Sequence, residues 1–194
     1  MIRLARDTDA GPMLEIYAPL VRETPISFEL APPSVEEFRE RVRKITARTP
    51  WLVCEADGEI QGYAYAGPFR ARPAYQWAVE TTVYVAAPHR GKGVARALYT
   101  ALLTGLRLAG YYRAYAGITL PNPASVATHE RLGFEPVGVF KEAGFKLGHW
   151  HDVGFWQLAL QGATADPAQP RPLPEVEKTT EWQGSLRAAE AGLR

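Results

Sequence analysis

Of the 194 residues, 46% are hydrophobic and 22% are charged, and 22 Lys and Arg balance 21 Asp and Glu. These values predict a globular protein whose partner is neither nucleic acid nor a membrane surface. The single cysteine excludes an intramolecular disulfide, no Cys/His spacing indicates a metal site, and the lack of a signal peptide or membrane-spanning run predicts a cytoplasmic protein.

The first part of the chain is predicted to form a strand, two helices and a hairpin. Residues 2–5 alternate like a short strand, and a helix is expected to begin at residues 7–9. Ser34 and Glu37 have the spacing of a capping box, which predicts the start of a second helix. Residues 51–67 contain two apolar runs around a short Asp-Gly turn, which is typical of a β-hairpin.

The segment at 79–97, VETTVYVAAPHRGKGVARA, is predicted to be a strand, a glycine-rich turn and a helix. Alternation places Glu80, Thr82 and Tyr84 on the strand face that does not enter the core. An apolar ladder at helical spacing begins at Val94. The first N–H groups of such a helix lack partners within the helix, so they can bind a phosphate.

The glycine-rich turn has the residue types that anion binding needs. Its glycines lack Cβ atoms that would hold an anion away from the backbone, and its basic side chains add local positive charge. The candidate residues are Arg90, Gly91, Lys92, Gly93, Val94, Ala95 and Arg96. The pattern Arg-x-x-Gly-x-Ala resembles the GNAT superfamily of acyl-CoA-dependent N-acetyltransferases, and the resemblance implies that this turn holds the pyrophosphate of coenzyme A. A glycine turn that merely starts a helix is the alternative.

The remaining elements extend this resemblance to the whole fold. They are a strand at 113–120, a helix at 123–132, a strand at 134–140, a loop at 141–152 and a strand at 153–160. The resulting order is that of the GNAT fold, which implies an α+β, three-layer α/β/α domain over 1–161 with a mixed, largely antiparallel sheet of about seven strands. The Pro- and Ala-rich segment 162–194 is expected to be a linker with a possible short helix at 181–193.

A second GNAT motif, Asn-x-x-Ala-x-x-x-Tyr-x-x-x-Gly-Phe, is matched by Asn122, Ser125, His129, Gly133 and Phe134. Two of these positions differ from the motif. Ser125 is still small and can hydrogen-bond the cofactor, so the resemblance assigns Asn122 and Ser125 to the cofactor site. His129 replaces a tyrosine near the coenzyme thiol, where it can donate or relay a proton. A purely structural histidine is the alternative.

Glu80 is the candidate general base. An amine must lose a proton to attack a thioester, and a carboxylate in a cleft can accept that proton directly or through water. By resemblance, the backbone of Val83, Tyr84 and Val85 is expected to hold the pantetheine arm beside it. A glutamate that only faces solvent from a strand is the alternative.

The runs AGPFRARPAYQWAVETTVYV and GHWHDVGFWQLAL resemble the phosphinothricin acetyltransferases, whose relatives also acetylate methionine sulfoximine and methionine sulfone. Arg70 and Arg72 are therefore expected to bind the anionic groups of the acceptor. Phe28 and Tyr75 are expected to wall the acceptor pocket, with Thr82 on the same cleft face. Two solvated loop arginines are the alternative.

Together these features predict an acetyl-CoA-dependent N-acetyltransferase that uses no metal. The expected reaction is direct transfer, in a ternary complex, to the α-amine of a small amino-acid analogue. The resemblance also implies a homodimer in which the loop at 148–152 closes the acceptor pocket. Two alternatives stay open: acetylation of another amine, such as a natural amino acid or a protein N-terminus, or a non-catalytic acyl-CoA-binding regulatory module.

Overall fold

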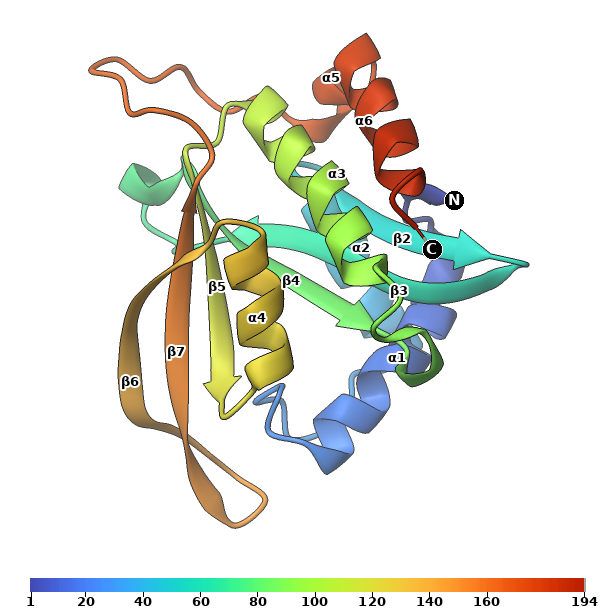
Figure 1. Ribbon diagram of the computed structural model, residues 1–194, viewed down its shortest axis with the longest axis vertical. Helices are drawn as coiled ribbons and strands as arrows, with labels where there is room; N and C mark the ends of the chain where they lie inside the picture. Colours follow the sequence, from blue (N-terminus) through green and yellow to red (C-terminus); the bar gives the residue numbers. More distant parts are fainter. Residues whose placement is uncertain (194) are drawn as a thin grey trace.

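The computed structural model describes residues 1–193 and contains one seven-stranded sheet between helices (Figure 1). The strands are β1 (Ile2–Leu4), β2 (Trp51–Ala56), β3 (Glu59–Pro68), β4 (Ala78–Val85), β5 (Arg113–Leu120), β6 (Glu135–Lys146) and β7 (His149–Ala159). The helices are α1 (Ala10–Glu23), α2 (Val35–Thr46), α3 (Val94–Ala109), α4 (Pro123–Arg131), α5 (Leu173–Val176) and α6 (Thr180–Glu190). The strand order is β1-β2-β3-β4-β5-β7-β6, and of the described neighbours only β4 and β5 are parallel. The expected mixed, largely antiparallel sheet is thereby confirmed.

Helices cover both faces of the sheet because each has one apolar face. On one face, Met13 of α1 and Phe38 of α2 pack with Tyr63 of β3 in a buried cluster. On the other, α3 buries residues at helical spacing, among them Leu98 and Leu102. Figure 1 shows α3 crossing the sheet with α6 beside it. The sheet therefore forms the middle layer of the domain.

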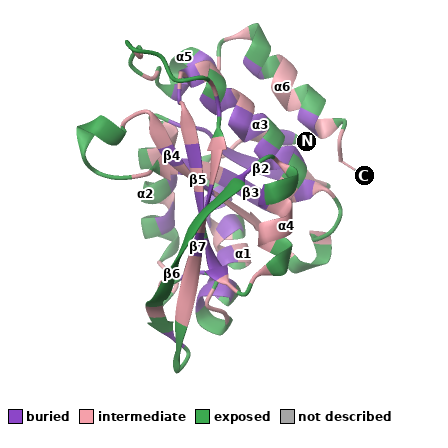
Figure 2. Cartoon of the chain, turned by 60° about the vertical axis from the view of Figure 1, so that its left-hand side comes forward, coloured by how far each residue is buried: buried purple, intermediate pink, exposed green. Residues whose placement is uncertain are grey.

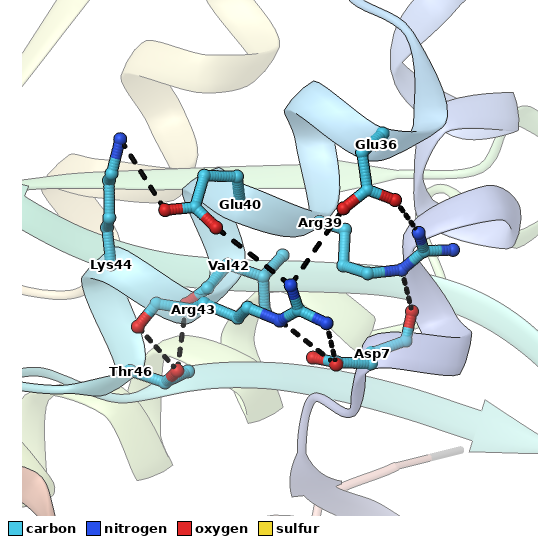
Figure 3. Close-up of polar contacts among 8 residues, drawn as sticks. All are labelled: Asp7, Glu36, Arg39, Glu40, Val42, Arg43, Lys44 and Thr46. Carbon is cyan, nitrogen blue, oxygen red and sulfur yellow. Dashed lines mark hydrogen bonds and ion pairs between the residues drawn. The ribbon is translucent and has the colours of Figure 1, made fainter.

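The capping box expected at the start of α2 is present. Ser34 Oγ accepts a hydrogen bond from the Glu37 N–H at 3.2 Å, and Glu37 Oε2 accepts one from the Ser34 N–H at 2.7 Å. The exposed face of this helix carries ion pairs, such as Arg43 with Asp7 at 2.5 Å and Lys44 with Glu40 (Figure 3). Exposed pairs contribute little to stability, because water screens the charges and the long side chains lose freedom on pairing. The apolar face of α2 therefore supplies most of its attachment.

The sheet opens between its two parallel strands. The pairing of β4 with β5 begins at Ala78 with Arg113 and ends at Glu80 with Tyr115. Beyond Glu80, β4 continues to pair with β3 as far as Val85, and β5 continues to pair with β7. The two strands therefore diverge after Glu80 and leave main-chain groups of β4 facing a gap rather than a neighbouring strand.

The prediction of a loop at 141–152 was wrong, because β6 and β7 occupy most of that range. β6 and β7 form a long hairpin whose tight turn is Leu147–Gly148, both in the left-handed region with φ of 52° and 80°. The register of β6 against β7 shifts between Phe140 and Gly144. Such a shift interrupts the alternation of apolar and polar residues by which a strand is detected in a sequence. Figure 2 shows that β6 is exposed along most of its length. An exposed strand has little apolar alternation to detect.

Segment 162–194, expected to be a linker with a possible short helix at 181–193, contains α5 and α6. Trp182 of α6 is 0% exposed and lies in the same core cluster as α3. Gly105 of α3 makes room for it, since a Cβ at that position would lie 2.3 Å from Trp182 Cζ3. Residue 194 of the predicted tail lies outside the described residues. Across residues 1–193, no helix combines the length and the apolar composition needed to cross a bilayer.

Candidate active site

The turn between β4 and α3 exposes the first N–H groups of the helix. Gly91 and Gly93 have φ of 74° and 86°, a conformation that side chains strain, and Gly93 is the N-cap of α3. Among residues 1–193 no side chain caps this end, and the first main-chain hydrogen bond runs from the Ala97 N–H to the Gly93 carbonyl. The N–H groups of residues 94–96 therefore face outward, where an anion can bind.

A cavity of about 550 Å³ lies at this turn, and we call it the larger cavity. Its wall contains Val83, Val85, every residue from His89 to Arg96, and Ala124, Ser125, Thr128, His129, Arg131 and Leu132. All seven expected turn residues, with Val83, Val85 and Ser125, therefore line one cavity. Arg131 of α4 adds a positive charge from the opposite wall that the sequence did not predict.

A second cavity of about 250 Å³, the smaller cavity, lies in the gap between β4 and β5. It is lined by Ile26, Ser27, Phe28, Glu80, Thr81, Thr82, Val83, Tyr84, Tyr99, Gly117, Ile118, Thr119, Asn122, Ser125 and His129. Phe28, Glu80 and Thr82 are brought together here as expected acceptor-side groups. Tyr84 and Asn122, which were expected to bind the cofactor, line this cavity and not the larger one.

The two cavities share three wall residues: Val83, Ser125 and His129. A molecule that enters from the α3 turn therefore meets a second molecule in the gap at these residues. The Asn122 side chain fixes this corner, because its Oδ1 accepts the Ser125 N–H at 3.1 Å and caps α4. The arrangement allows a group to pass from one bound molecule to another.

Glu80 stands where β4 and β5 separate. Its Oε1 lies over Gly117, where a Cβ would approach it to 3.3 Å. Burial raises the pKa of the Glu80 carboxyl, and the nearby charge of Arg70 opposes part of that rise. Within residues 1–193 no hydrogen bond occupies this carboxylate. It is thus a partly buried base, available to a molecule in the smaller cavity.

His129 is buried, with 4% of its surface exposed, and both ring nitrogens are engaged. Its Nδ1 lies 2.8 Å from the Ser125 carbonyl oxygen and therefore donates, and its Nε2 lies 2.9 Å from the Tyr99 hydroxyl. Burial lowers the pKa of His129, which favours the neutral ring. The neutral ring carries its proton on Nδ1, so its Nε2 accepts a hydrogen bond from the Tyr99 hydroxyl.

Three expected acceptor-binding residues lie outside the walls of both cavities. Arg70, Arg72 and Tyr75 are exposed on the segment between β3 and β4. This segment is held near Glu80 by stacking: Arg70 lies 5.0 Å from the centroid of the Phe69 ring, and that ring stacks on Tyr115 at 4.1 Å. Tyr115 is the partner of Glu80 across the ladder.

Tyr99 is the main site residue that the sequence did not predict. It is fully buried on α3, lines the smaller cavity and joins His129 to Thr81, whose Oγ1 lies 3.4 Å from the Tyr99 hydroxyl. Its position within an apolar helix face made it look like core. The available signal was a tyrosine within an apolar helix face, because a tyrosine hydroxyl that is buried usually has a polar partner.

The histidines at 149 and 151 do not form a metal site with other residues. His151 Nε2 lies 3.0 Å from the Lys146 carbonyl oxygen. In the described part of the chain, no group of three or more His, Cys, Asp or Glu side chains is arranged to hold a metal ion.

Comparison with known proteins identifies the family. The family model described as "Acetyltransferase (GNAT) domain" matches residues 2–154. Phosphinothricin N-acetyltransferase of Streptomyces viridochromogenes is 40% identical over 175 residues, which cover 90% of this chain and 93% of the relative. The L-methionine sulfoximine/L-methionine sulfone acetyltransferase of Salmonella typhimurium is 33% identical over 171 residues, covering 86% and 98%.

Solved structures give the same result. The crystal structure of a GNAT superfamily phosphinothricin acetyltransferase from Sinorhizobium meliloti in complex with AcCoA has a TM-score of 0.83 and 37% identity, covering 87% of this chain and 92% of that one. A putative acetyltransferase from Salmonella typhimurium, solved with acetyl-CoA, has a TM-score of 0.83 and 32% identity, covering 87% and 98%. The chain therefore belongs to the GNAT superfamily of acetyl-CoA-dependent N-acetyltransferases.

Proposed function

We propose that this N-acetyltransferase acetylates the α-amine of a small amino-acid analogue of the phosphinothricin, methionine sulfoximine or methionine sulfone type. The observation that carries the proposal is the junction of the two cavities at Val83, Ser125 and His129, with Glu80 in the smaller one. Relatives named for these acceptors match most of the chain. We also propose that the protein acts in the cytoplasm, since its reaction consumes acetyl-CoA.

The larger cavity fits acetyl-CoA by charge and shape. The bare N–H groups of α3, with Arg90, Lys92 and Arg96, would hold the diphosphate, and Arg131 adds charge from α4. The side of the β4 main chain at 83–85 that faces the gap, where β5 no longer pairs with it, would hold the pantetheine arm. When bound, acetyl-CoA supplies an acetyl group activated as a thioester.

Glu80 and His129 are proposed as the catalytic residues of a direct transfer in a ternary complex. The Glu80 carboxylate takes the proton from the acceptor ammonium, so that the nitrogen has a free electron pair. Tyr99 and His129 hold a proton between Tyr99 Oη and His129 Nε2 at the junction of the cavities. This pair is placed to give a proton to the departing thiolate and to take one back from the acceptor nitrogen as the amide forms.

The acceptor is proposed to occupy the smaller cavity, whose volume of about 250 Å³ suits a small molecule. Thr82, Asn122 and Phe28 supply polar groups and an aromatic wall, and Arg70 and Arg72 are proposed to bind the acceptor's anionic groups from the adjacent segment. A thiol-release assay with phosphinothricin, methionine sulfoximine, methionine sulfone and the common amino acids tests this. Turnover restricted to other amines would refute the acceptor class, and cofactor binding without any turnover would favour a regulatory module.

Replacing the turn glycines should weaken acetyl-CoA binding. Gly91→Ala and Gly93→Ala each place a side chain at a left-handed position of the turn, which should shift the N–H groups there, and the loss of one hydrogen bond to a charged group costs about 1.5–3 kcal/mol. The dissociation constant measured by calorimetry should therefore rise about tenfold or more.

Gly58→Ala is the matched control for those variants. Gly58 has φ of 78° in the hairpin turn between β2 and β3, with nothing within 4 Å of the added Cβ, so it has the same backbone strain without the pocket. Equal affinity in all three variants and the wild type would remove the diphosphate site from this turn.

A homodimer is proposed through the β6/β7 hairpin. Large apolar side chains on this hairpin are exposed: Val137, Val139, Phe140, Phe145 and Trp150. Val139→Asp should reduce the mass measured by light scattering from two chains to one, since a buried charge opposes association. Val35→Asp, an exposed apolar position on α2, is the control. A wild-type protein with the mass of one chain at micromolar concentration would refute the dimer.

A further inference from the structure

One wall of the smaller cavity is built from Ile26, Ser27 and Phe28, in the segment between α1 and α2. This segment has no helix or strand of its own, so its contacts with neighbouring elements determine the position of this wall. Ser27 Oγ lies 2.6 Å from the Tyr17 hydroxyl of α1 and accepts the Glu29 N–H at 3.2 Å. These bonds hold the segment from the α1 side.

The end of β6 holds the same segment from the other side. Lys146 is 5% exposed, and its ammonium donates to the Ser27 carbonyl oxygen at 2.5 Å. The charged group that faces it is Glu29, which is itself paired with Arg41. A buried ammonium with a main-chain acceptor is costly to release, because the charge would lose its partner. Lys146 therefore fixes the position of the Ser27 carbonyl, next to Phe28 in the chain.

The Phe28 ring lies against Gly144 of β6. A Cβ at Gly144 would lie 2.3 Å from Phe28 Cε2 and 2.7 Å from Cδ2, whereas carbon atoms in contact are about 3.5–4.0 Å apart. Gly144 does not have a left-handed backbone, so alanine is compatible with its conformation. The ring alone therefore requires glycine at this position.

We propose that Gly144 is a specificity-determining position and Lys146 a positioning residue, which together set how far the Phe28 wall stands from Glu80. The proposal rests on the proposed function, because it takes the smaller cavity as the acceptor site. Ser27 is tied on both sides, so a methyl group at position 144 displaces the ring and not the segment. We expect the displaced ring to move into the smaller cavity, whose wall it forms, and so to shorten that cavity.

The test compares two acceptors that differ by one methylene: methionine sulfone and the shorter S-methylcysteine sulfone. In Gly144→Ala, the ratio of kcat/KM for the longer acceptor to that for the shorter one should fall about tenfold, the usual effect of one methylene in a closed pocket. Gly138→Ala is the control, because it lies on the same strand and its Cβ would meet nothing within 4 Å. Its ratio should equal that of the wild type.

A second variant tests Lys146 separately. Lys146→Met keeps the length of the side chain but removes the bond to Ser27, so the KM for methionine sulfone should rise about tenfold while kcat is retained. Lys141→Met, an exposed lysine of the same strand that pairs with Asp152, should leave KM unchanged. The acetyl-CoA dissociation constant should match that of the wild type in every variant, which also shows that each one folds.

The outcomes separate this proposal from the proposed function. A wild-type enzyme that acetylates none of the two sulfones, phosphinothricin and methionine sulfoximine refutes both. A wild-type enzyme that acetylates the two sulfones, with Gly144→Ala keeping the ratio of Gly138→Ala and Lys146→Met keeping the wild-type KM, overturns only the role of the hairpin. If Gly144→Ala does not fold, the KM of Lys146→Met decides.

Discussion

Glu80→Gln is expected to lower kcat about 10²–10⁴-fold, the usual contribution of a general base, while acetyl-CoA affinity is unchanged. The amide has nearly the same shape as the carboxylate but cannot accept the proton of the acceptor ammonium. Glu80 is absent from the wall of the larger cavity, so its loss should not disturb the cofactor. Stopped assays of thiol release, together with calorimetry of acetyl-CoA binding, measure the two effects.

The pH profile provides the control for that variant. Because burial raises the pKa of Glu80, the base is lost as pH falls through a value above its ordinary 4.5, and kcat/KM should have an acidic limb there. The limb should disappear in Glu80→Gln. Arg70→Ala removes a charge that opposes the rise, so it should move the limb to higher pH. A wild-type profile identical to that of Glu80→Gln would exclude Glu80 as the base.

Trp182→Ala is expected to lower the free energy of unfolding by about 3–5 kcal/mol, as for other large aromatic side chains removed from a core. Trp182 belongs to α6 and is fully buried against Gly105 of α3, and Pro50 also lies beside Gly105. Urea denaturation monitored by circular dichroism measures the change. The prediction would be contradicted by a loss below about 0.5 kcal/mol, the range of ordinary surface substitutions.

Trp182→Phe is the matched variant for this experiment. Among the described residues, the buried Trp182 Nε1 has no hydrogen-bond partner, and an unsatisfied buried donor costs about 1–3 kcal/mol. Phenylalanine keeps much of the apolar contact and removes that donor, so its loss of stability should be clearly smaller. A loss as large as that of Trp182→Ala would mean that the whole indole is needed to fill the space.

Features with a strong local signal could be predicted from the sequence. The capping box at Ser34 and the glycines at 91 and 93 act within a few residues of themselves, so their residue types determine the local backbone. The family resemblance supplied the mixed, largely antiparallel sheet of about seven strands. The β6/β7 hairpin could not be predicted in the same way, because an exposed strand needs no alternation of apolar residues.

The site was harder to predict where it depends on packing between distant segments. Glu80 and Phe28 were expected in one cleft and do line one cavity, but Tyr84 and Asn122 line that cavity too, although they were expected to bind the cofactor. Which side of a strand a cavity opens on depends on where β4 and β5 separate, and no local pattern encodes that point. Tyr99 was missed for the same reason, since a helix face cannot show what lies opposite it.

The open edge of β4 has a consequence for how such an enzyme can change its preference. Peptide groups are the same whichever amino acids carry them, so a substrate held by main chain is insensitive to most substitutions along that strand. The proposed acceptor site is instead enclosed partly by side chains from the α1–α2 segment, which contacts the β6/β7 hairpin. Mutations there can alter the choice of amine while the machinery that delivers the acetyl group stays intact.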